Sequence, residues 1–62
     1  MQAYTVSYTR FDEFPSTNLV WAESYGQVER EFEHCSWFAA SVAPEWKVRE
    51  CRGKGMPERW LS

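Results

Sequence analysis

One segment of the chain has the apolar periodicity of an amphipathic helix. From Ser24 onward, apolar residues recur three or four positions apart, while charged residues fill the opposite face. Ser24 followed three positions later by Gln27 is a capping box, in which both side chains accept hydrogen bonds from backbone N–H groups at the start of a helix. The pattern predicts a helix over residues 25–38. The apolar stripe consists of Tyr25, Val28, Phe32, Cys35 and Ala39.

Three other segments alternate between two sets of side chains with the period of a β-strand. Residues 3–10 alternate most regularly, residues 18–23 run directly into the Ser24 cap, and residues 46–52 form the third predicted strand. Residues 38–44 either prolong the helix by a turn before Pro44 or form a loop that buries Phe38 and Val42. Residues 53–62 begin at a glycine-rich turn and end as a short tail.

The order strand–strand–helix–strand limits the possible topologies. The first two strands form a hairpin, and the helix carries the chain back in a right-handed crossover. We predict a single α+β domain over residues 1–62, with a three-stranded antiparallel sheet of order 2-1-3 and one helix packed on one face. The expected core consists of Tyr4, Val6, Tyr8, either Trp21 or Val20, Val28, Phe32, Cys35, Trp46 and Val48. Over residues 3–52 this ββαβ order resembles small proteins encoded on bacterial mobile elements, and no residue roles are carried over from that resemblance. The small size and simplicity of the chain favour a bacterial or phage-like setting.

The composition fits a small domain with a reinforced core. A chain of 62 residues buries only about 60% of its unfolded surface. Aromatic residues make up 18% of the chain, and each ring can bury roughly 150–250 Å². The aromatic excess therefore compensates for the small size.

Candidate chemistry is sparse. His34 and Cys35 are adjacent, so on a helix their side chains diverge, and Cys35 lies on the apolar stripe, where a thiol is inert. With Cys51 they are too few for a closed zinc site. The carboxylates of Glu29, Glu31 and Glu33 share a wet helix face. We expect no catalytic residue, metal ligand, cofactor or small-molecule substrate, and no enzyme.

Two cysteines do not form a disulfide framework, and no signal peptide or membrane span is visible. These features predict a cytoplasmic protein. A Cys35–Cys51 bridge would require the two side chains to meet across the helix–sheet interface.

The first binding hypothesis is a non-enzymatic accessory or regulatory protein that acts through protein–protein contacts or self-association. A three-stranded sheet with one helix leaves its other face and both edges uncovered. Tail residues near the C-terminus either anchor a partner or seal the core of their own domain. The candidate partner-binding residues are Trp37, Phe38, Trp60 and Leu61.

The alternative hypothesis is a nucleic-acid-binding module. The net charge is −2, but residues 35–62 carry five basic residues against three acidic ones, and Trp46 or Trp60 offers a ring on which a base could stack. The interleaved glutamates weaken this alternative. The candidate phosphate-binding residues are Lys47, Arg49, Arg52, Lys54 and Arg59.

Overall fold

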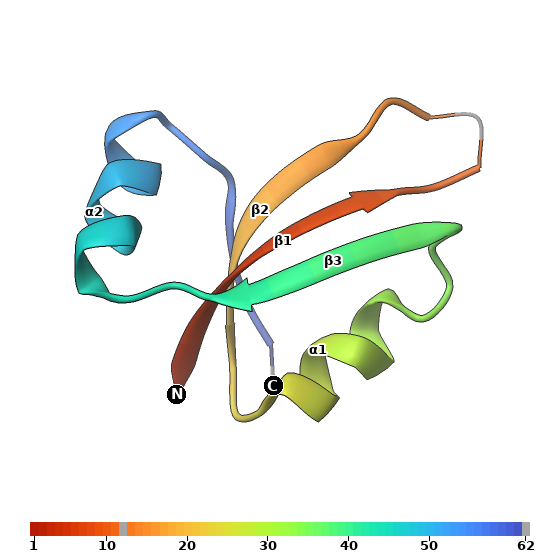
Figure 1. Cartoon of the computed structure of the whole chain (residues 1–62), viewed down its shortest axis with the longest axis horizontal. Coiled ribbons are helices and arrows are strands. Elements are labelled where there is room, and N and C mark those ends of the chain that lie inside the picture. The colour runs from red at the N-terminus through yellow and green to blue at the C-terminus, as the bar shows by residue number, and fades with distance from the viewer. Residues whose placement is uncertain (12, 62) are drawn as a thin grey trace.

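The computed structural model describes residues 1–11 and 13–61 of the chain. Figure 1 shows an open sheet with two short helices at its flanks. The elements in chain order are β1 (Gln2–Thr9), β2 (Ser16–Ala22), α1 (Tyr25–Phe32), β3 (Trp37–Val42), α2 (Glu45–Gly53) and β4 (Glu58–Trp60).

The sheet has four strands in the order β3-β1-β2-β4. β1 pairs with β2 and with β3 in antiparallel fashion, while β4 pairs with β2 in parallel. The predicted α+β class is confirmed. The predicted three-stranded antiparallel sheet with one helix is wrong, because the described residues form a mixed four-stranded sheet with two helices. A third strand does lie beside β1, as the order 2-1-3 requires, but it comes from a different segment of the chain.

Residues 46–52 were predicted as that third strand, and the prediction is wrong because they belong to α2. Their alternation is imperfect: Glu50 would share a strand face with Trp46 and Val48. Val48 and Cys51 are instead three positions apart and are both buried on one helix face. The Glu45 carboxylate accepts a hydrogen bond of 2.6 Å from Arg49 one helical turn later, a pair that supports a helix and not a strand.

The helix predicted over residues 25–38 begins as expected and ends early, at Phe32. Ser24 Oγ accepts a hydrogen bond from the Gln27 N–H at 3.3 Å, and Gln27 Oε1 accepts one from the N–H of Glu23, one residue before the expected position. The N–H and hydroxyl of Ser36 then both donate to the Thr9 carbonyl oxygen, at 3.0 and 2.8 Å. These bonds tie the chain to the end of β1 and start β3.

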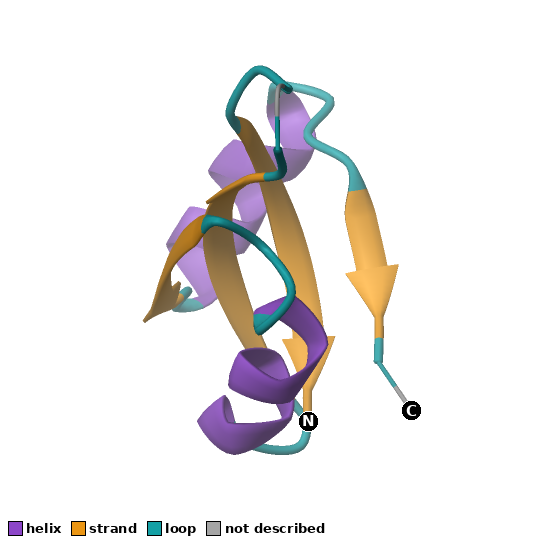
Figure 2. Ribbon diagram, turned by 90° about the vertical axis from the view of Figure 1, so that its right-hand side faces the viewer, coloured by secondary structure: helices purple, strands orange, loops and turns teal. Residues whose placement is uncertain are grey.

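The two helices cover opposite faces of the sheet, as Figure 2 shows. Both helices connect parallel strands, but the chain crosses the sheet in opposite directions, so right-handed crossovers require opposite faces. The sheet therefore separates two small cores. The core under α1 contains Tyr4, Val6, Val20, Ala22, Val28, Phe32 and Leu61. The core under α2 contains Ala3, Leu19, Ala43, Val48 and Cys51.

The tryptophans and cysteines lie partly outside the predicted core. Val20, not Trp21, lies in the core under α1, and Trp46 is 64% exposed on α2. Cys35 packs against the α1 core and Cys51 lies in the α2 core, so the sheet stands between them and both are free thiols.

The tail turns back and completes the sheet. Gly55 has a φ of 73°, a left-handed conformation that glycine adopts without the steric cost of a Cβ. β4 then runs beside β2, with the Leu61 N–H donating to the Trp21 carbonyl oxygen at 2.8 Å. Leu61 is 7% exposed and belongs to the α1 core. The tail therefore seals its own domain.

Candidate functional site

β3 is an edge strand that carries no charged residue and no proline. Its sequence is Trp-Phe-Ala-Ala-Ser-Val, and among the described residues it pairs with β1 alone. Edge strands in folded proteins usually carry a charge, a proline or a bulge, or lie under a helix or loop, because their free N–H and C=O groups invite another strand. β3 has neither the charge nor the proline.

Along β3, the backbone N–H and C=O groups of successive residues point alternately toward β1 and toward the free side of the sheet. The Ala43 N–H donates to the Ala3 carbonyl oxygen at 2.8 Å, and the β1–β3 register continues this pairing without a shift. Because bonded and non-bonded positions alternate in an antiparallel ladder, Ala39 and Ser41 also face β1. The N–H and C=O groups of Phe38, Ala40 and Val42 therefore point away from the sheet.

The side chains of β3 add apolar surface on both sides of this edge. Trp37 is 53% exposed and Val42 is 59% exposed. Phe38 is half-buried, with its ring centroid 6.2 Å from that of Phe32 on α1. A hollow of about 380 Å³ is lined by Phe38 and by charged residues on and just after α1, Glu29, Arg30 and Glu33. The edge thus combines an open backbone with exposed apolar groups.

The opposite edge of the sheet is protected. β4 has three residues, and two of them are charged and paired. Glu58 accepts hydrogen bonds from Arg52, while Arg59 donates to Glu31 Oε2 at 2.7 Å. A short, charged strand offers little to an incoming chain. Of the two edges, the β3 edge is therefore the one without charged residues.

The four predicted partner-binding residues do not form one surface. Trp37 and Phe38 lie on β3, while Trp60 and Leu61 lie on or next to β4 at the other edge. Leu61 is buried. Trp60 stacks on Trp21, with ring centroids 4.6 Å apart and planes 5° apart, and stays 61% exposed. Among the described residues, the β3 pair lies at the charge-free edge, whereas Trp60 lies at the charged one.

The five predicted phosphate-binding residues each form an ion pair. Lys47 and Lys54 both pair with Glu50, at 3.2 and 3.4 Å. Hydrogen bonds from Lys47 and then Lys54 hold the pKa of the Glu50 carboxyl below its ordinary value. The remaining pairs are Arg49 with Glu45, Arg52 with Glu58 and Arg59 with Glu31. Arg59 also lies on the face opposite α2, so the five cations do not share one surface.

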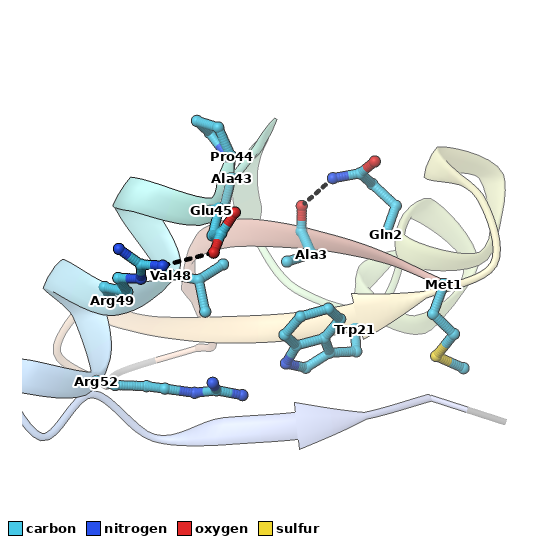
Figure 3. Close-up of a pocket in the computed structure, with 10 residues that line it drawn as sticks. All are labelled: Met1, Gln2, Ala3, Trp21, Ala43, Pro44, Glu45, Val48, Arg49 and Arg52. Carbon is cyan, nitrogen blue, oxygen red and sulfur yellow. Dashed lines mark hydrogen bonds and ion pairs between the residues drawn. The ribbon is translucent and has the colours of Figure 1, made fainter.

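A pocket of about 350 Å³ lies between α2 and the start of β1, and Figure 3 shows Trp21 and Val48 among its lining residues. Its charged groups are already engaged. Arg52 lies 5.7 Å from the Trp21 ring and donates to both Glu58 oxygens, and Trp21 Nε1 donates to Glu58 Oε2 at 2.7 Å. These bonds, with that from Arg52 the strongest influence, lower the pKa of Glu58, and Glu58 in turn raises the pKa of Arg52.

Candidate catalytic and metal-binding groups do not gather in the described part of the chain. No group of three or more histidine, cysteine or acidic side chains there could hold a metal ion. The His34 ring is exposed, 4.0 Å from the Glu33 carboxylate. Among the same residues, neither helix has the length or apolar character to cross a membrane.

Comparisons with protein-family models, with curated proteins and with solved structures found no match. Any functional proposal must therefore come from the geometry of this chain.

The sequence interpretation identified Trp37 and Phe38 but missed the strand to which they belong. One signal could have revealed it. Charged residues are absent from three runs of the sequence, residues 1–9, 14–22 and 35–44, and these runs contain β1, β2 and β3. Residues 45–59, which carry eight charges, contain α2 and the start of β4.

Proposed function

We propose that this chain is a non-enzymatic protein-binding module whose β3 edge accepts a strand from a protein partner. The observation that carries the proposal is the exposed edge of β3, which has no charge or proline along its length. Strand addition of this kind gains affinity from main-chain hydrogen bonds and specificity from alternate side chains. Trp37, Phe38 and Val42 supply the side chains that a partner would contact.

Nucleic-acid binding is the weaker alternative. A phosphate would have to displace a carboxylate from each of the five basic residues, because all five are paired within the chain. For either role we propose a reducing compartment such as the cytoplasm, with which two free thiols are compatible.

The experiment is affinity capture with a proline variant at the outward-facing position of β3. Ala40→Pro removes an N–H that points to the free side, so the β1–β3 hydrogen bonds are kept while strand addition is blocked. Phe14→Ala is the matched control, because Phe14 is 92% exposed in the loop before β2.

We expect the wild type and Phe14→Ala to retain a protein, either another protein or a further copy of this chain, from nuclease-treated extract of cells that express the chain. Ala40→Pro should not retain it. Equal capture by Ala40→Pro would contradict the proposal. A partner that disappears with nuclease treatment would favour the nucleic-acid alternative. The circular dichroism spectrum of Ala40→Pro should match that of the wild type, which checks that the fold is intact.

A further inference from the structure

The outward-facing groups of β3 are complementary to themselves. We propose that the strand added to β3 is β3 of a second copy of this chain, paired antiparallel about a two-fold axis at Ala40. This inference rests on the proposed function, since both require that the edge accept a strand. It adds the identity of the partner, the register and a continuous sheet that spans two chains.

The backbone sets the register. The outward N–H and C=O groups belong to Phe38, Ala40 and Val42, which are evenly spaced about Ala40. A two-fold axis there places Ala40 opposite Ala40 of the second copy, and Phe38 opposite Val42 of the second copy. Each of these pairs exchanges two hydrogen bonds. An axis at Ala39 would instead set Val42 opposite Ser36, which lies outside the strand.

The side chains fit the same register. On the face that carries α1, Phe38 lies against Val42 of the second copy, and the small methyl groups of Ala40 meet at the axis. On the other face, Ala39 lies opposite Ser41 of the second copy, with the exposed Trp37 ring diagonal to that serine and within its reach. The pairing covers exposed apolar surface.

The charges favour a second copy over a charged segment of another protein. Because β3 carries no charge, it offers no cross-strand counter-ion to a charged strand. A second β3 brings no charge of its own. The pairing of two β3 strands therefore places no like charges directly opposite each other, an arrangement that would be destabilising.

The first test is amide exchange of the wild-type protein, measured by NMR at about 1 mM and about 10 µM, a range that spans weak dimer affinities. We expect slow exchange at Phe38, Ala40 and Val42 at the higher concentration and rapid exchange on dilution. The amides of Ala39 and Ser41, which face β1, stay protected at both concentrations. Rapid exchange of all three outward amides at 1 mM would overturn the dimer.

The second test uses charges at Ala39 and Ser41, which are both exposed and do not contribute to either core. In the proposed register each lies opposite the other in the second copy. Ala39→Lys with Ser41→Lys creates repulsive pairs and should weaken association about tenfold or more. Ala39→Lys with Ser41→Glu creates attractive pairs and should restore the wild-type affinity to within about threefold.

Sedimentation equilibrium measures the association, with the 7.4 kDa chain as the monomer mass. If the lysine–glutamate variant is as weak as the double-lysine variant, the register is wrong. A wild type that is monomeric at about 1 mM, yet still captures a partner through β3, overturns the dimer and leaves the proposed function standing. A monomeric wild type with no β3-dependent capture overturns both.

Discussion

Truncating Leu61 to alanine tests whether the C-terminal tail is part of the fold. Leu61 is 7% exposed and packs with Val20, Val28 and Phe32 under α1. Leu-to-Ala changes in protein cores cost about 2–5 kcal/mol, and the cost is smallest where the surroundings can collapse. Because Leu61 directly follows β4 at an edge of the sheet, where the surroundings can adjust, we expect a loss near the low end, about 2–3 kcal/mol.

That loss is large against the whole stability of the domain. At roughly 0.05–0.15 kcal/mol per residue, a chain of this length is stable by about 3–9 kcal/mol. In a domain this small, each kcal/mol lowers the Tm by about 4–8 °C. Leu61→Ala should therefore lower the Tm by about 10–20 °C, a shift that circular dichroism detects easily.

The measurement must be made on dilute protein, because dimerisation would add stability by mass action. Phe14→Ala is the control and should change the free energy of unfolding by less than about 0.5 kcal/mol, as is usual for exposed sites. A Leu61→Ala Tm within 2 °C or so of the control would refute the reasoning. The tail would then be free to anchor a partner, as the sequence alone allowed.

Three further predictions concern charge, thiols and backbone. Glu58 has a folded pKa below its ordinary value near 4.5, so its contribution to stability is complete above that value and is lost as the pH falls through the folded pKa. In urea titrations from about pH 6 to pH 3, the free energy of unfolding should fall less steeply with pH in Glu58→Gln than in the wild type. An equally steep fall in both proteins would contradict this prediction. Under native conditions a thiol reagent should modify the half-buried Cys35 much faster than Cys51, which is 1% exposed. Similar rates would contradict the burial of Cys51 in the core under α2. Gly55→Ala should lower the free energy of unfolding in urea by about 1 kcal/mol, because φ is positive at Gly55. The matched Gly53→Ala, where an added Cβ meets no neighbouring atom, should be neutral or stabilising. If Gly53→Ala were the more destabilising of the two, the turn geometry would be refuted.

Local signals predicted the first half of the fold well. β1 and β2 were found from alternation, and α1 from the Ser24–Gln27 cap. Each of these signals lies within a few residues of the element it specifies. Even so, the end of α1 was misplaced, because the apolar spacing continues through Cys35 and Ala39 although the chain leaves the helix after Phe32. The Ser36 bonds to Thr9 that enforce the exit join residues far apart in sequence.

The second half was mispredicted because its signals conflict. Residues 46–52 alternate roughly as a strand would, while Val48 and Cys51 have helical spacing and Glu50 accepts from Lys54 one turn later. Ion pairs between residues three or four positions apart favour the helix over the strand in this segment. β4 was not predicted at all, because a strand of three residues is too short to show a regular alternation of side chains. Its parallel pairing with β2 also depends on the helix that precedes it.

The candidate site was harder to predict than the fold, because it depends on which strand lies at the edge. A charge-free run is expected for β1, which has a strand on each side and contributes Tyr4 and Val6 to one core and Ala3 to the other. The same run on β3 is not required by the domain itself. Ala39 and Ser41 are exposed, so lysine at either position would leave both cores intact and would discourage edge pairing. β4, at the other edge, does carry charges. The two edges therefore differ in a way that monomer stability does not explain and that the proposed strand partner for β3 would explain.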